Sequence, residues 1–175
     1  MGADLYIESI SDAAREEWSP VFDKAVSERD QWMKDHEDML TTEQKQASNR
    51  WIWAPQDGDE ALIPEEYLSL LKKVNEAYNN MYPDAGYYRD SYNSSNLLWK
   101  LDISYWGDGS DYIDEEGYMQ VSKIRHFKGV IEARLHLLDH ISPDDEQEYF
   151  KDKARRLLDF LDKALQLEEA IYCSV

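Results

Sequence analysis

Apolar residues recur every three or four positions along most of this 175-residue chain, and this spacing constrains the fold more than any other feature. Such a period places the apolar side chains on one face of an α-helix. It predicts helices over about residues 12–38, 41–51, 64–82, 96–106 and 118–140, and a last helix from Ser142 through Ile171. Only residues 5–7 are β-prone. We therefore predict an all-α fold, in which residues 1–175 form one domain of five or six mostly antiparallel helices joined by short connections.

The charge of the chain is strongly negative and unevenly placed. The net charge is −18, with 11 acidic and 4 basic residues in each of the segments 1–40 and 106–150. Such an excess repels nucleic acid and acidic membranes and favours a basic protein surface as the partner. The alternative is that the charge only keeps the protein soluble. The candidate acidic binding surface comprises Asp108, Asp111, Asp114, Glu115, Glu116, Asp144, Asp145 and Glu146.

A second candidate site lies in residues 87–106, which combine aromatic rings with hydrogen-bonding side chains. The polar-aromatic cluster consists of Tyr87, Tyr88, Arg89, Asp90, Tyr92 and Asn93. The Arg89 guanidinium beside Asp90 and the tyrosine rings could hold an anionic or planar ligand. In the alternative interpretation, the charged and amide side chains satisfy backbone groups where an irregular loop crosses the core.

A metal half-site is the third candidate. Glu132, His136 and His140 share one face of the predicted 118–140 helix. Leu137 follows the first histidine, where a zincin helix carries glutamate, and Cys173 is the only cysteine. No motif for a nucleophile or a phosphate-binding loop is found, so we predict no catalytic residue and no cofactor. A non-enzymatic role is favoured, and an enzyme remains the alternative. A single cysteine fits a reducing compartment, and no apolar run predicts a membrane segment, so we expect a cytoplasmic protein.

Two segments carry a resemblance to known sequences. The opening GADLYI, residues 2–7, and the segment YYRDSYNSSNLLWKLDISYW, residues 87–106, resemble uncharacterised small proteins of phage and bacterial genomes. The resemblance implies no activity, ligand or catalytic residue.

Two functions are therefore expected. The first is an acidic interaction protein, such as a phage-type inhibitor that docks on a basic groove of a CRISPR or restriction effector, where carboxylates imitate phosphates. The alternative is a ligand- or metal-binding domain that uses Arg89, Asp90, Tyr92 and Asn93 together with His136 and His140.

Overall fold

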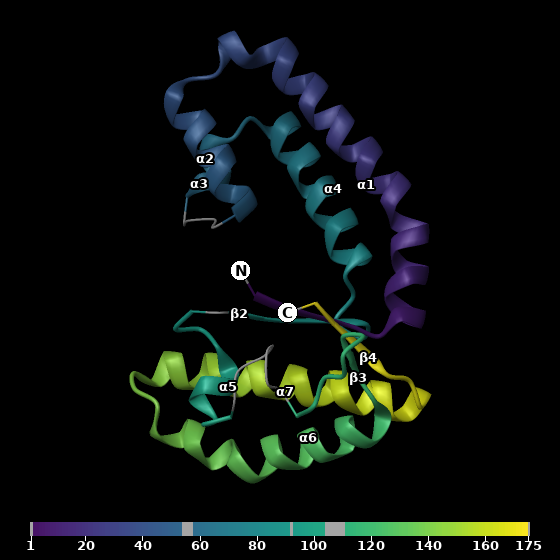
Figure 1. Cartoon of the computed structure of the whole chain (residues 1–175). Helices are drawn as coiled ribbons and strands as arrows, with labels where there is room; N and C mark the ends of the chain where they lie inside the picture. Colours follow the sequence, from purple (N-terminus) through teal and green to yellow (C-terminus); the bar gives the residue numbers. More distant parts are fainter. Residues whose placement is uncertain (1, 54–57, 92, 104–110, 175) are drawn as a thin grey trace. The chain divides into compact units, whose positions relative to one another are not determined.

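A computed structural model describes residues 2–53, 58–91, 93–103 and 111–174, which form two compact units. Unit 1 comprises Met1–Asp12 and Pro83–Val175, and unit 2 comprises Ala13–Tyr82. The described chain is mostly helical, as predicted, but it also contains a small four-stranded antiparallel sheet (Figure 1). The all-α prediction was therefore incomplete. The single domain stays a prediction, because two compact units can still unfold as one cooperative domain.

The sheet of unit 1 brings together segments from both ends of the chain. Its strands are β1 (Gly2–Tyr6), β2 (Tyr87–Ser91), β3 (Tyr118–Met119) and β4 (Ile171–Ser174), in the order β2-β1-β4-β3. Strands of two to five residues show too little alternation to be detected from sequence. The β-prone residues 5–7 do coincide with the end of β1, which is a central strand of the sheet.

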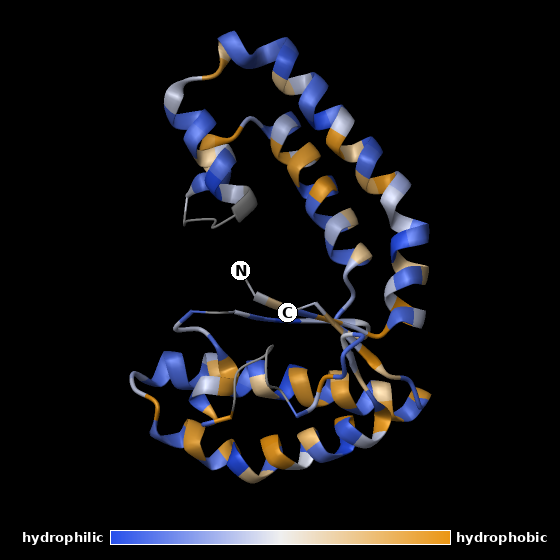
Figure 2. Ribbon diagram, in the orientation of Figure 1, coloured by the Kyte–Doolittle hydropathy of each residue, from blue (hydrophilic) through white to orange (hydrophobic). Residues whose placement is uncertain are grey.

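Three helices and a 3-10 segment of unit 1 complete its core. They are α5 (Leu97–Lys100), α6 (Val121–Arg134), the 3-10 segment η2 (Leu135–His140) and α7 (Asp144–Leu167). The helices α6 and α7 run side by side on one side of the sheet (Figure 1). Both carry hydrophobic and hydrophilic residues, as amphipathic helices do (Figure 2). Their buried side chains pack with those of the strands, and the core includes Leu5, Met119, Ile124, Phe127, Ile131, Phe150, Leu157, Phe160, Leu161 and Ile171.

Unit 2 is helical throughout its described part. It contains most of α1 (Glu8–His36), the 3-10 turn η1 (Glu37–Met39), α2 (Thr42–Trp53), α3 (Asp59–Leu62) and α4 (Glu65–Met81). Thr41 and Gln44 form the reciprocal hydrogen bonds of a capping box at the start of α2. The core of this unit is a smaller cluster around Ala47, Ile63, Tyr67 and Leu71.

Two of the predicted helices differ most from those observed. The 96–106 helix is reduced, in its described part, to α5, which Asn96 caps by accepting a hydrogen bond from the Trp99 N–H at 2.9 Å. The 118–140 helix begins with β3 and changes to 3-10 geometry at Leu135. Among the described residues, no helix has the length and apolar character needed to cross a lipid bilayer.

Candidate functional site

Strand β2 carries most of the predicted polar-aromatic cluster and divides it between two sides of the sheet. Successive side chains of a strand point to opposite faces. Tyr88 and Asp90 are therefore buried on the helix-covered side, whereas Tyr87 and Arg89 lie on the other side and are less buried. Asn93 is exposed and accepts a hydrogen bond from the Ser95 N–H at 2.9 Å, and Tyr92 lies outside the described residues. The described members of the cluster on β2 therefore do not share one face of the sheet.

The side of the sheet away from α6 and α7 carries a row of four tyrosines, one from each strand. Tyr6 is in register with Tyr87 and Tyr172, and Tyr172 is in register with Tyr118. The ring centroids lie 5.3 Å apart for Tyr6 and Tyr87, 6.2 Å for Tyr6 and Tyr172, and 5.4 Å for Tyr118 and Tyr172. Cross-strand aromatic pairs of this kind stabilise a sheet.

The row ends in a charged group on β1 and β2. Tyr87 donates its hydroxyl hydrogen to Asp4 at 2.6 Å, and Arg89 pairs with the same carboxylate at 3.2 Å. Burial, and then the hydrogen bond to Asp4, raise the pKa of Tyr87. Arg89 thus has a partner on its own side of the sheet.

Asp90, on the opposite side, has a structural role. It is fully buried, pairs with the Lys153 ammonium at 2.6 Å and accepts hydrogen bonds from the backbone N–H groups of Ser91 and Leu97. Lys153 also donates to the Ser95 carbonyl at 2.5 Å. These contacts fasten β2 and the turn after it to α7. They agree with the second interpretation of the cluster, in which its polar groups satisfy the backbone.

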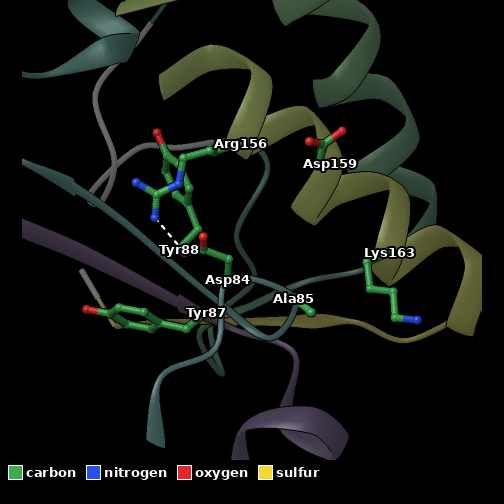
Figure 3. A pocket seen from close by; sticks show the side chains of 7 residues that line it. All are labelled: Asp84, Ala85, Tyr87, Tyr88, Arg156, Asp159 and Lys163. Carbon is green, nitrogen blue, oxygen red and sulfur yellow. Dashed lines mark hydrogen bonds and ion pairs between the residues drawn. The ribbon is translucent and has the colours of Figure 1, made fainter. Parts of the chain in front are cut away.

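A cavity of about 310 Å³ opens between β2 and α7. It is lined by Asp84, Ala85, Tyr87, Tyr88, Arg156, Asp159 and Lys163, and Arg156 pairs with Asp84 across 2.6 Å (Figure 3). A second cavity of about 150 Å³ shares Tyr88 and Arg156 with the first. The α7 residues were not predicted, although their spacing at positions 156, 159 and 163 places them on one helical face.

The hydroxyl of Tyr88 is buried beside this cavity. Within the described part of the chain it is a buried polar side-chain atom that has no hydrogen-bond partner. Burial raises the pKa of Tyr88 well above its ordinary value, so the hydroxyl is neutral and able to donate. Buried hydroxyls are normally hydrogen-bonded, which makes this group a feature that needs an explanation.

The predicted acidic surface is distributed along unit 1. Asp111, Glu115 and Glu116 are exposed before β3, whereas Asp144 and Asp145 are exposed at the start of α7. Because β3 pairs with β4, which follows the far end of that 24-residue helix, the two groups lie at opposite ends of it. Asp108 is outside the described residues, and Glu146 pairs with Lys100 at 2.9 Å.

Asp114 belongs to the turn before β3. Its carboxylate accepts hydrogen bonds from the Gln120 side chain at 2.8 Å and from the backbone N–H groups of Tyr118 and Glu116. These bonds, the one from Gln120 most of all, hold the pKa of Asp114 below its ordinary value. The residue therefore organises the turn.

The predicted metal half-site lacks the geometry of a continuous α-helix. Glu132 pairs with Lys128 at 2.7 Å, and His136 Nδ1 lies 3.1 Å from the Ala133 carbonyl oxygen. Glu132 lies in α6, whereas the two histidines lie in η2, where the 3-10 geometry begins at Leu135. The described residues contain no group of three His, Cys, Asp or Glu side chains that could hold a metal ion.

Comparisons with known proteins add no functional assignment. The resemblance to phage and bacterial proteins therefore stays a prediction. No protein-family model, curated protein or solved structure matches the chain.

Proposed function

We propose that the protein is an acidic binding protein that docks on the basic groove of a nucleic-acid-binding protein and takes the place of the nucleic acid there. The observation that supports this function is a row of exposed carboxylates on α1, formed by Glu16, Asp23 and Asp30. We call these three residues the α1 acidic row.

The spacing of the row suits a phosphate-binding groove. Residues seven apart on an α-helix lie about 10.5 Å apart along the axis and within about 20° of each other around it. Phosphates of one DNA strand advance about 3.4 Å per nucleotide along the helix axis, so every third phosphate has a similar axial spacing. A rigid helix therefore presents the three carboxylates at intervals that a groove lined with lysine and arginine can match.

Two other acidic residues of α1 have side-chain partners. Glu28 lies 3.9 Å from both Lys24 and Lys73, and Asp35 accepts hydrogen bonds from Gln31. In the α1 acidic row, only Asp30 has an ion-pair partner among the described residues, which is Arg29 at 2.7 Å. Glu16 and Asp23, which have no ion-pair partner among the described residues, thus keep their negative charge available to a partner.

A nuclease assay tests this function. CRISPR and restriction nucleases are the partner class, and cleavage of target DNA is measured with and without the protein at low and high salt. We expect at least one nuclease to be inhibited, and we expect the inhibition to weaken as salt rises, because interactions between exposed charges are screened.

Two sets of charge reversals identify the surface. Replacing Glu16, Asp23 and Asp30 by lysine should abolish inhibition. The control variant reverses three exposed acids on other helices, Glu43, Glu76 and Glu148. It changes the net charge by the same amount and should keep most of the inhibition. If both triple variants lose inhibition to the same extent, the effect belongs to net charge and the proposed docking row is wrong.

A further inference from the structure

We propose that the cavity between β2 and α7 binds a small zwitterion of the α-amino-acid class. This site is independent of the docking function proposed above, and all the residues that line it belong to unit 1. A ligand of this class carries one carboxylate and one ammonium group, and the cavity offers separate partners for both.

The charged groups of the cavity are incompletely paired. Asp159 and Lys163 are four residues apart on α7, and among the described residues neither has a hydrogen-bond or ion-pair partner. Figure 3 shows Asp159 between Arg156 and Lys163 along the helix. A carboxylate and an ammonium group that face the same cavity without pairing can each contact the opposite charge of one ligand.

The Tyr88 hydroxyl provides a second, independent indication of a ligand. It is buried and has no hydrogen-bond partner in the described structure, and Tyr88 is one of the residues that line both adjoining cavities. Figure 3 shows the Tyr88 ring beside the Arg156 side chain. A ligand carboxylate next to Arg156 could accept a hydrogen bond from this hydroxyl. Its burial without a partner is costly, so any group that accepts the bond gains affinity.

The charge of unit 1 disfavours anionic ligands. This unit contains 22 acidic and 11 basic residues, so a ligand with a net negative charge is repelled at long range. A purely apolar ligand would desolvate the half-exposed Arg156–Asp84 pair without replacing its water contacts. A zwitterion has no net charge and satisfies both signs.

The size of the cavity also agrees with a small ligand. A volume of about 310 Å³ is at the lower end of the range for small-molecule sites. Ala85 and the Tyr88 ring provide the apolar part of the lining, against which an amino-acid side chain could pack.

The experiment uses the full chain and the twenty common L-amino acids as probes, with binding measured by isothermal titration calorimetry and by NMR shifts of the α7 amides. At least one amino acid should bind saturably. Its amide and its N-acetyl derivative, which each lack one charge, should bind at least about fivefold more weakly, as expected for the loss of one hydrogen-bonded ion contact. Acetate and inorganic phosphate should not bind.

Three variants place the binding in this cavity. Tyr88→Phe should weaken it about fivefold without loss of fold stability, because the removed hydroxyl has no partner in the free protein. Asp159→Asn and Lys163→Met should weaken it to a similar extent, whereas Lys123→Met and Glu148→Gln, at exposed positions outside the cavity, should not.

The proposal is overturned if no amino acid binds. It is also overturned if phosphate or acetate binds as well as the amino acid, or if Tyr88→Phe leaves the affinity unchanged. A crystal structure in which ordered water alone satisfies Tyr88 at saturating amino acid would contradict it as well.

Discussion

The substitution Lys153→Met tests whether the buried ion pair between β2 and α7 organises unit 1. Lys153 and Asp90 lie 2.6 Å apart, and their side chains are 8% and 0% exposed. Removing the ammonium leaves the buried Asp90 carboxylate without the positive charge of Lys153 beside it. Loss of one partner of such a pair typically costs about 3–5 kcal/mol.

This loss is a large part of the stability of a protein of this size, because the whole free energy of unfolding is about 5–15 kcal/mol. For a chain of 150–250 residues each kcal/mol shifts Tm by about 2–4 °C, so a decrease on the order of 10 °C is expected. Urea unfolding followed by far-UV circular dichroism gives the free energy directly, and thermal melts give Tm.

Two further variants separate the ion pair from general effects of a lysine substitution. Adding Asp90→Asn to Lys153→Met should recover about 1–3 kcal/mol, because asparagine keeps an oxygen for the backbone N–H groups and removes the unpaired charge. Lys151→Met, two residues earlier on α7, removes a half-exposed lysine that pairs with Asp139 at 2.7 Å, and should change stability much less. If Lys153→Met unfolds at the same urea concentration as Lys151→Met, the reasoning about Asp90 is refuted.

Three other predictions follow from the structure. Cys173 is buried, which raises its pKa to about 12. A thiol reagent at pH 8 should therefore react with it only as fast as the protein unfolds. Rapid labelling of the native protein would contradict the burial of this thiol. Gly86→Ala should lower the free energy of unfolding by about 1–3 kcal/mol, because the added Cβ would lie 2.6 Å from Ile10 Cγ2. Gly129→Ala, on an open part of α6, should raise the free energy of unfolding by about 0.5–1 kcal/mol. Urea titrations that give both changes the same sign would refute this comparison. The depressed pKa of Asp114 contributes stability above the unfolded-state pKa of about 3.9, and this contribution is lost as pH falls through the folded-state pKa. The free energy of unfolding should therefore decrease more between pH 5 and pH 2.5 for the native sequence than for Asp114→Asn.

The helices could be predicted from the sequence where a long apolar period coincides with terminal signals. Pro64 precedes α4 and Pro143 precedes α7, and both helices begin within two residues of the predicted positions. The start of the 12–38 helix was predicted four residues late, since α1 begins at Glu8; it continues through Pro20. Ile171, which continues the apolar period of α7, instead belongs to β4.

The sheet and the cavity could not be predicted, for a common reason. Each depends on pairing between segments far apart in the chain, such as Leu5 with Cys173 or Asp90 with Lys153. In the sequence, a five-residue strand such as β2 alternates over too short a length to be told from an irregular segment. Tyr88 and Arg89 were therefore placed in one predicted cluster, although the strand directs their side chains to opposite sides of the sheet. The partner of a buried charge is set by tertiary structure, which local sequence does not specify.

The central claim is that the α1 acidic row occupies a groove that otherwise holds nucleic acid, and a competition measurement tests it most directly. A nuclease inhibited by the protein is bound to fluorescently labelled target DNA, and the anisotropy of the DNA is followed as the protein is added. We predict that the native sequence displaces the DNA and lowers the anisotropy to that of free DNA, and that the Glu16, Asp23 and Asp30 lysine variant does not. An inhibited complex in which protein and DNA remain bound together, with the anisotropy undiminished, would contradict the claim.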